Sequence, residues 1–280
     1  MKIVRIYEQN LSAFSPLLNP DYERQLRSGM LHAFGAVVRD VAEGILVFGV
    51  KKEGLFLLHD LSVALSYRQR GIAAELLTWF TQLALDEGAP VLTSFDDTPD
   101  SAVRRLLEKC GFAVTDSIAK SFVVPLKALR GITVLDGMKY MEQVKPVASE
   151  NGLLWKRFCG KQEERGNTLL SISYAPEAEP ELNLCIRQGA EIAGCVIGKR
   201  LSENRYELSH ACTGEKQFWA LMPLLAAFRE NLLNMGEPSA ELSMTAVTEA
   251  SVRLAQKLMP EECVCVGRKQ AVFGVNASGV

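Results

Sequence analysis

The sequence predicts an α/β protein of two domains, each an α+β arrangement with a mixed sheet. Three observations lead to this prediction. The chain has 280 residues, which is longer than one compact domain usually is. Within each half, short alternating apolar runs give way to helical stripes of apolar residues. The order of these segments in the first half returns in the second half, and a repeat this long indicates duplicated domains and not a solenoid.

The composition excludes several classes of protein. Hydrophobic residues make up 48% and charged residues 23% of the chain, which is typical of a globular protein. The net charge of −2 and the lack of a long basic run disfavour a nucleic-acid partner. No run approaches the roughly 18 apolar residues of a membrane-spanning helix, and the N-terminus does not resemble a signal peptide. Seven dispersed cysteines suit reduced thiols, so we expect a cytoplasmic protein.

Periodicity and punctuation divide the first half into the elements of one domain. Alternating runs mark the strands, and prolines interrupt the first helical stretch. We expect, in order, strand Lys2–Tyr7, an interrupted helix Leu11–Ser28, strands Ala33–Arg39, Gly44–Val50 and Leu55–Leu65, a helix from Ile72 to near Gly88, strand Val91–Phe95, helix Asp100–Cys110 and strand Phe112–Val124.

The second half repeats this order after a linker-like segment, Pro125–Gly131. Gly236 and Pro238 follow Gly88 and Pro90 at the same offset, 236 − 88 = 238 − 90 = 148. We therefore expect domains at residues 1–128 and 129–280. The expected elements are helical stretches Met138–Val147 and Gly152–Cys159, strands Leu182–Arg187, Glu191–Leu201 and Tyr206–Cys212, helix Phe218–Asn234, strand Ala240–Met244, helix Glu249–Leu258 and strand Cys263–Phe273.

The turn between Leu55–Leu65 and the helix that begins at Ile72 has the features of a phosphate site. The odd positions of the strand are apolar except for His59, so one face should be buried. Gly71 can adopt positive φ and lets the backbone approach an anion. The first helical N–H groups have no partner within the helix, and the helix dipole adds positive charge there. Arg68 and Arg70 add formal charge, so the turn predicts a cradle for phosphate.

The run from Leu61 to Leu77 resembles the signature strand, loop and helix of the GNAT superfamily of N-acetyltransferases. The Gln/Arg-x-x-Gly-x-Gly/Ala pattern of that family is met by Arg68, Gly71 and Ala73. Glu108-Lys109-Cys110-Gly111-Phe112 is similar to the ending of the family's following helix. The resemblance covers residues 1–125 well, and the second half only in the order of its elements.

The resemblance implies binding of acetyl-coenzyme A as the acyl donor, with no metal. The strand would offer backbone groups to the pantetheine arm at Leu61, Ser62 and Val63. The loop and the first helical turn would hold the pyrophosphate at Arg68, Gln69, Arg70, Gly71, Ile72, Ala73 and Ala74. Two positions depart from the family pattern, because Asp100 stands where many members have Asn and Leu107 stands where many have a Tyr that protonates the departing thiolate.

His59 and Asp60 are the candidates for the catalytic base, directly or through water. A structural histidine and a hydrogen-bonded residue at a strand edge remain the alternatives for these two positions. A backbone N–H near Val63 is the expected donor to the thioester oxygen. No metal site is expected, because Cys263 and Cys265 lack a second pair of ligands.

The corresponding turn of the second half, Cys212–Phe218, lacks the cradle, since Glu215 would repel a phosphate. We therefore expect tandem GNAT-type domains with a degenerate second copy. The expected activity is acetyl transfer to an amine of a small molecule or peptide, with neither nucleic acid nor membrane as a partner. The alternative is a non-catalytic acyl-coenzyme A sensor or interaction module.

Overall fold

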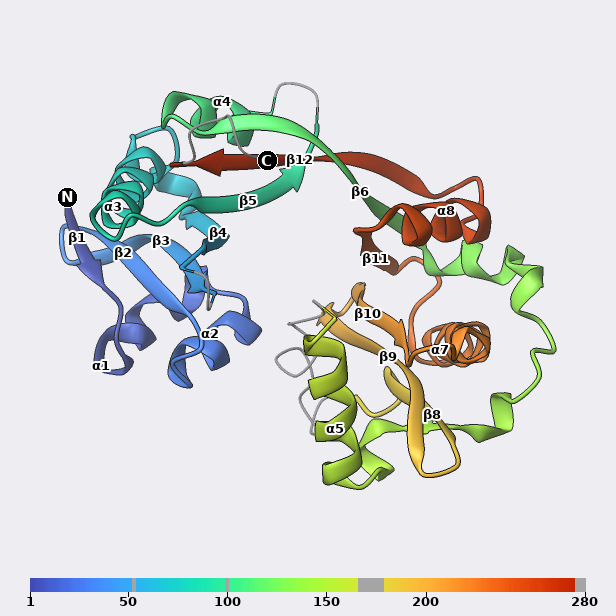
Figure 1. Ribbon diagram of the computed structural model, residues 1–280. Helices are drawn as coiled ribbons and strands as arrows, with labels where there is room; N and C mark the ends of the chain where they lie inside the picture. Colours follow the sequence, from blue (N-terminus) through green and yellow to red (C-terminus); the bar gives the residue numbers. More distant parts are fainter. Residues whose placement is uncertain (52–53, 99–100, 166–178, 275–280) are drawn as a thin grey trace. The chain divides into compact units, whose positions relative to one another are not determined.

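The computed structural model describes residues 1–51, 54–98, 101–165 and 179–274, which form two compact units (Figure 1). Unit 1 comprises Met1–Ser117 and the C-terminal segment that begins at Arg268, whereas unit 2 comprises Ile118–Gly267. This corrects the expected division into 1–128 and 129–280. The second unit begins earlier than expected, and the chain returns to the first unit at its end.

Unit 1 contains nearly all the elements expected of the first half, in the expected order. Its sheet has the strand order β1-β2-β3-β4-β5-β12-β6. The elements are β1 (Lys2–Arg5), α1 (Glu8–Leu11), the 3-10 segment η1 (Ser12–Leu17), α2 (Pro20–Arg27), β2 (His32–Val38), β3 (Val41–Val50), β4 (Phe56–Val63), η2 (Leu65–Tyr67), α3 (Ile72–Asp86), β5 (Val91–Asp96), α4 (Ala102–Lys109), the start of β6 (Ala113–Pro125) and the end of β12 (Val264–Phe273). Asp100, expected at the start of α4, lies outside the described residues.

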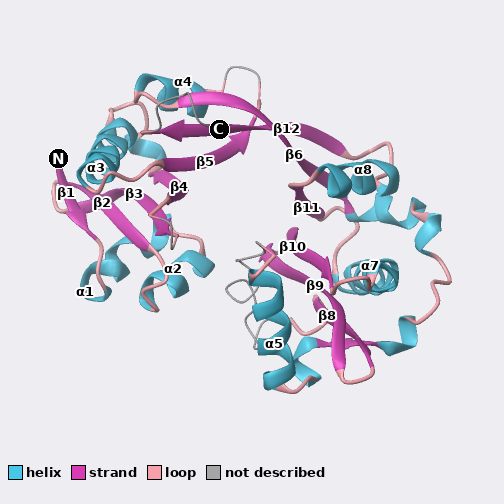
Figure 2. Cartoon of the chain, viewed as in Figure 1, coloured by secondary structure: helices cyan, strands magenta, loops and turns pink. Residues whose placement is uncertain are grey.

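Helices cover both faces of the unit 1 sheet, with α3 on one side and α1 and α2 on the other (Figure 2). On the α3 side, the Phe48 and Phe80 rings lie 4.8 Å apart between centroids, and both side chains are buried. On the other side, Phe14 packs directly on Gly35, where an added Cβ would lie 2.3 Å from the ring. The glycine is therefore required for close contact between η1 and β2.

Unit 2 repeats this architecture around a sheet of strand order β6-β11-β10-β9-β8-β7. Its largest buried cluster includes Leu224, Phe228 and Leu232 of the helix that matches α3. The elements are the end of β6, η3 (Leu126–Gly131), η4 (Thr133–Leu135), η5 (Met141–Gln143), β7 (Val144–Pro146), η6 (Val147–Ser149), α5 (Gly152–Glu163), β8 (Asn183–Gln188), β9 (Glu191–Ser202), β10 (Arg205–Thr213), η7 (Phe218–Ala220), α7 (Leu221–Met235), β11 (Glu241–Ala246), α8 (Glu249–Leu258) and the start of β12.

Two expectations about the start of the second half are wrong. Pro125–Gly131 is not a linker, because Leu126 and Leu129 are buried in the unit 2 core and the Leu126 N–H donates to the carbonyl of Ala240. Met138–Val147 is not a helix, because part of it forms β7, which pairs with β8. In both segments tertiary burial and strand pairing override the local sequence signal.

The strands β6 and β12 each begin in one unit and end in the other. The last six residues of β12, Arg268–Phe273, pair antiparallel with β5 inside unit 1. The end of β6, Lys120–Pro125, pairs antiparallel with β11 inside unit 2. Each unit thus receives one strand from a segment that the linear sequence assigns to the other half. This exchange is the physical reason for the corrected division.

We expect Ala271→Asp to unfold part of unit 1. Ala271 is fully buried opposite Thr93 of β5, and an unpaired buried charge costs about 3–5 kcal/mol. Hydrogen exchange should show lost protection in β5. Val264→Asp, at the exposed start of the same strand, is the matched control and should retain that protection. An unchanged β5 in Ala271→Asp would contradict the contribution of β12 to unit 1.

Candidate functional site

The candidate site begins where β4 and β5 separate. In the described chain these parallel strands pair at Phe56–Val91 and Leu57–Leu92, and the Thr93 hydroxyl donates to the carbonyl of Leu58 over 3.0 Å. Beyond this point β4 continues along β3 to Val63, whereas β5 continues along β12. We call this divergence the fork. It leaves one edge of β4 without the strand neighbour that the other edge has.

A β-bulge at His59 sets the geometry of β4 within the fork. Val47 pairs with Asp60 and Phe48 pairs with Leu58, so His59 is the extra residue. The bulge reverses the alternation of side chains, which corrects the expectation of one apolar face at odd positions. Phe56 and Leu58 lie on the α3 side before the bulge, and Leu61 and Val63 lie there after it. The bulge therefore decides which face of the sheet the side chains of Asp60, Leu61, Ser62 and Val63 occupy.

The backbone of β4 after the bulge alternates between β3 and the fork. The Ala64 N–H donates to the Glu43 carbonyl over 2.9 Å, so even-numbered residues direct their backbone groups toward β3. Leu61 and Val63 therefore direct theirs toward the fork. The backbone of Ser62, expected to bind the pantetheine arm, is instead directed toward β3. Its hydroxyl donates to Asp60 Oδ2 over 3.0 Å.

Asp60 and His59 both lie on the face opposite α3. Asp60 pairs with Val47, which is buried on that face. Burial raises the pKa of the Asp60 carboxyl, and hydrogen bonds from Ser62 and from the Leu61 N–H oppose the rise. A carboxylate with a raised pKa is a stronger base than an exposed one. Among the residues of β4 after the bulge, Leu61 and Val63 have backbone groups directed to the fork, and the Leu61 N–H also lowers the pKa of Asp60.

The His59 ring lies against Gly49 and the helix α2. An added Cβ at Gly49 would lie 3.0 Å from His59 Nε2, and the Tyr22 ring centroid lies 6.2 Å from the His59 centroid. Burial, and then the positive charge of Lys51, lower the pKa of His59. The imidazole is therefore neutral over a wider range of pH than an exposed histidine.

A tight loop connects β4 to α3 at the open end of the fork. Gln69 has φ of 62°, and Gly71, the N-cap of α3, has φ of 82° and ψ of −2°. No heavy atom lies within 4 Å of the position of a Cβ at Gly71, so the backbone there is accessible. The first described backbone bond of α3 is from the Glu75 N–H to the Gly71 carbonyl, 3.0 Å. The N–H groups of Ile72, Ala73 and Ala74 precede it, in the position that binds anions.

The two arginines of this loop help to hold its shape. Arg68 Nε donates to the Val63 carbonyl over 3.2 Å, which links the loop to the end of β4. The Arg70 guanidinium lies 4.8 Å from the centroid of the Tyr67 ring, a cation–π contact. Both arginines are exposed and lie in the loop that precedes the helix N-terminus. Their positive charge therefore adds to that of the helix dipole.

Leu107 is buried in the core between α4 and α3, with 2% of its surface exposed. The residue supplies no polar atom, in contrast to the Tyr expected from the resemblance.

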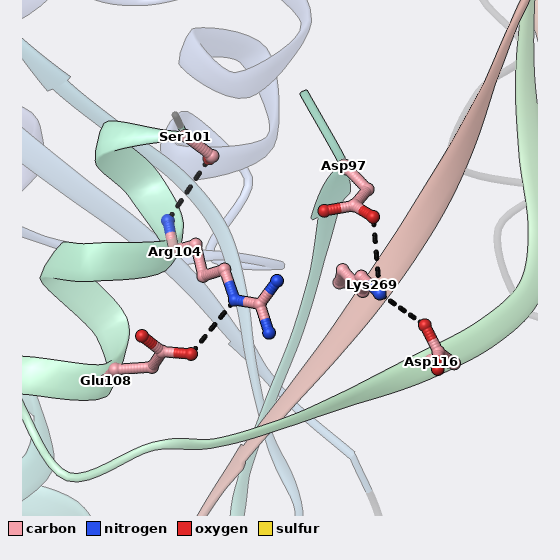
Figure 3. A network of polar contacts seen from close by, with 6 residues as sticks. All are labelled: Asp97, Ser101, Arg104, Glu108, Asp116 and Lys269. Carbon is pink, nitrogen blue, oxygen red and sulfur yellow. Dashed lines mark hydrogen bonds and ion pairs between the residues drawn. The ribbon is translucent and has the colours of Figure 1, made fainter. Parts of the chain in front are cut away.

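Ion pairs that sequence reasoning missed connect the end of β5 with β6 and β12, and a second group of polar contacts lies within α4 and its cap (Figure 3). Lys269 Nζ lies 3.2 Å from Asp97 Oδ2 and also bonds Asp116. Arg104 of α4 pairs with Glu108, and the Ser101 hydroxyl caps the helix by accepting from the Arg104 N–H. The network ties the segment that follows the fork to β12. No local signal could reveal it, because Lys269 is distant in sequence.

Unit 2 has a fork of the same construction. Leu208 pairs with Gly198 and His210 with Ile197, so Ser209 is an extra residue in β10, as His59 is in β4. Parallel pairing of β10 with β11 ends at Leu208–Met244. A cavity of about 490 Å³ lies there, lined mainly by apolar side chains of β10, β11, α7 and α8.

The turn that follows β10 differs from the Gly71 loop. Glu215 forms an ion pair with Arg165 at 3.3 Å, and the Thr213 carbonyl accepts a hydrogen bond from Gln162. The helix α7 is preceded by η7, and its N-cap Ala220 is right-handed instead of a left-handed glycine. Phe218 at this turn is 78% exposed. The features that predict an anion cradle in unit 1 are therefore replaced in unit 2.

The described residues offer neither a metal-binding cluster nor a membrane-spanning helix. The described residues include no group of three or more His, Cys, Asp or Glu side chains arranged to hold a metal ion. All seven cysteines are free. Among the described helices, none is both long and apolar enough to cross a membrane.

Comparisons with known proteins place these features in context. Residues 4–112 match the acetyltransferase (GNAT) family. The fold is similar to that of a tandem GNAT protein from the clavulanic acid biosynthesis pathway, with a TM-score of 0.66, 12% identity and 99% of each chain covered. It is also similar to a GCN5-related N-acetyltransferase from Sphaerobacter thermophilus, with a TM-score of 0.56, 15% identity and 97% and 95% of the two chains covered. No curated protein matches the sequence.

We expect Asp60→Asn to stabilise the protein at neutral pH. The pKa of this carboxyl is higher in the folded protein than in the unfolded chain, where it is about 3.9. The wild type therefore loses stability as the pH rises from the unfolded pKa through the folded pKa. The variant should unfold at a higher temperature at about pH 7, and at the wild-type temperature below about pH 3. Asp116→Asn is the control. Because Lys269 lowers the pKa of the Asp116 carboxyl, this variant should unfold at a lower temperature than the wild type at neutral pH. A destabilised Asp60→Asn at neutral pH would contradict the burial penalty.

Proposed function

We propose that this protein is a GNAT-type acetyltransferase that transfers an acetyl group from acetyl-coenzyme A to an amine. The match of residues 4–112 to the GNAT family model and the similarity of the whole chain to a tandem GNAT fold support this proposal. The acceptor is a small molecule or a peptide. The observation that carries the proposal is the combination of the fork with the left-handed Gly71 at the N-terminus of α3. All seven cysteines are free thiols, which supports a cytoplasmic location.

The donor binds along β4 and ends at the Gly71 loop. The pantetheine arm adds to the free edge of β4 as an extended strand would, at Leu61 and Val63. The pyrophosphate accepts hydrogen bonds from the N–H groups at the start of α3. Gly71 fits this role because its Cα faces open space, where a phosphate can approach the backbone. Ile72 is buried and fixes the helix, while Ala73 and Ala74 keep the first turn narrow.

The chemistry is direct attack of a neutral amine on the thioester carbonyl. The Val63 N–H stabilises the negative charge that develops on the carbonyl oxygen. Asp60 accepts the proton from the amine, directly or through water, and its raised pKa suits this role. His59 lies beside Asp60 as a neutral imidazole and is the second candidate for proton transfer. The amine becomes an amide and coenzyme A leaves as a thiolate.

The thiolate leaves without a tyrosine at the position of Leu107. A thiol has a pKa of about 8.5, so the thiolate is a stable leaving group near neutral pH. The buried Leu107 nevertheless favours a second candidate function, a sensor that binds acyl-coenzyme A without turnover. Both candidates require the same donor site, and only the transferase consumes an amine.

The second domain does not bind the donor in this proposal. Its turn has an acidic residue, Glu215, and its helix lacks the left-handed glycine cap. The apolar cavity at its fork and the exposed Phe218 distinguish it further from a phosphate site. The degenerate copy therefore retains the fold and has lost the cradle.

We expect acetyl-coenzyme A to stabilise the wild type by about 2.7 kcal/mol at 100 times its dissociation constant. Gly71→Glu should abolish the thermal shift, because the side chain adds negative charge and bulk to the cradle and disfavours φ of 82°. Each variant is compared with its own ligand-free form, so a loss of intrinsic stability does not affect the result.

Gly214→Glu is the matched control, because Gly214 occupies the corresponding turn of unit 2. A Cβ there meets its nearest atoms at 3.4 Å, which is ordinary contact. This variant should keep the full shift. A wild type without a shift would contradict donor binding, and a shift that survives Gly71→Glu would contradict its location.

A panel of amines with acetyl-coenzyme A separates the two candidate functions. We expect amine-dependent release of free coenzyme A thiol by the wild type. Asp60→Asn should lower kcat at least tenfold, since general base catalysis contributes about 10²–10⁴-fold, while the donor-induced thermal shift is kept. Donor binding without release for every amine would favour the sensor, and full activity of Asp60→Asn would remove Asp60 as the base.

A further inference from the structure

Four of the seven cysteines are gathered in one buried cluster of unit 2, which neither the fork nor the Gly71 loop uses. Cys159 of α5 packs against three cysteines on adjacent strands, Cys185 of β8, Cys195 of β9 and Cys212 of β10. In the strand register, Cys195 is opposite Cys185 on one side and opposite Cys212 on the other. The three thiols therefore form a row across the sheet, which the dispersed sequence positions did not reveal.

Cys195 and Cys212 are already in contact. Their Sγ atoms lie 3.5 Å apart, and either thiol can donate a hydrogen bond to the other. The Gly214 N–H donates to the Ala193 carbonyl over 2.7 Å. By alternation, Cys195 and Cys212 also form a hydrogen-bonded pair of the antiparallel ladder, where Cα atoms lie about 5.5 Å apart. This separation lies within the range of about 4.4–6.8 Å that a disulfide requires.

Within the cluster, Cys212 is the thiol that a small reagent reaches first. Cys195 is fully buried, and Cys159 and Cys185 are buried as well. Cys212 is partly exposed and is one of the residues that line the cavity of about 490 Å³ in unit 2. Burial raises the pKa of Cys159 to about 11 and that of Cys185 to about 12, so both stay protonated at neutral pH.

We propose that Cys195 and Cys212 are an oxidative modification site that forms a reversible disulfide with a hydroperoxide as the oxidant. The Cys212 sulfur attacks one peroxide oxygen, the O–O bond breaks, and the products are Cys212 sulfenic acid and water when the oxidant is hydrogen peroxide. The Cys195 sulfur then attacks the sulfenic sulfur, the S–O bond breaks, and its proton leaves with the hydroxide as a second water. The two thiols lose two electrons in total, and the peroxide gains them.

The disulfide is readily reduced because the ladder opposes its geometry. A disulfide brings Cβ atoms to about 3.8 Å, closer than the roughly 4.5–5.5 Å between Cβ atoms of directly opposite residues in an antiparallel pair. The strands β9 and β10 must therefore shift when the bond forms. Strained disulfides have higher reduction potentials and exchange with cellular thiols. The disulfide thus forms on exposure to a peroxide and is reduced again by a thiol.

The test uses the full chain treated with hydrogen peroxide, followed by denaturation, alkylation of remaining thiols and tryptic digestion without reduction. Arg187 and Lys199 separate the peptides that carry Cys185, Cys195 and Cys212. Mass spectrometry should find the Cys195 and Cys212 peptides joined, with two hydrogens lost, and dithiothreitol should restore both. Sulfinic acid at Cys212 with unmodified Cys195, or a disulfide from Cys212 to Cys159 or Cys185, would overturn the proposal.

Two cysteine variants and a denatured control test whether the folded structure selects the Cys195–Cys212 pair. Cys212→Ser, at the partly exposed position, should abolish the joined peptides, and Cys265→Ser, at an exposed position of β12, should leave them unchanged. Wild-type protein oxidised in guanidinium should lose the preference for the Cys195–Cys212 pair. An equal preference in the unfolded chain would show that the folded geometry does not select the pair.

Discussion

One extra residue in β4 controls the arrangement of the candidate site. The bulge at His59 reverses side-chain alternation, so Leu58 and Leu61 share the α3 face while Asp60 lies on the opposite face. The same shift decides which backbone groups face the fork, and it directs those of Val63 there. Without the bulge, the Asp60 side chain and the Val63 backbone groups would point in other directions. The Gly71 loop follows this open edge of β4, so the proposed anion site and the proposed pantetheine edge are continuous.

Short-range patterns in the sequence predict most of the fold and the left-handed turn at Gly71, whereas the phosphate cradle at this turn stays a prediction. Strand and helix periods are short-range, and a left-handed glycine before a helix is visible in the sequence pattern around Gly71. The bulge at His59 was missed because it depends on how β4 registers with β3. The burial of Leu126, the Lys269 network and the cysteine row were missed for the same reason, since each joins residues distant in sequence.

The two units share the same order of strands and helices and differ at the turn that follows the fork. Both have an extra residue in the strand before the fork, His59 or Ser209, and both fill the following helix with core leucines. The fork is therefore a feature of the shared fold, because the strand pairing of both units produces it. The features proposed for the anion site belong to the turn, because unit 2 has a 3-10 turn where unit 1 has a left-handed glycine and yet keeps the same strand pairing. A duplicated domain can thus keep its fold while the turn after its fork changes.

The placement of β12 has a consequence for the order in which the protein is made. The ribosome releases the chain from the N-terminus, and domains generally fold as they emerge. Residues 1–117 leave the ribosome first, yet their sheet pairs β5 with residues 268–273, which follow unit 2 in the sequence. The domain that carries the fork and the Gly71 loop therefore waits, with an unpaired β5 edge, until unit 2 has been synthesised.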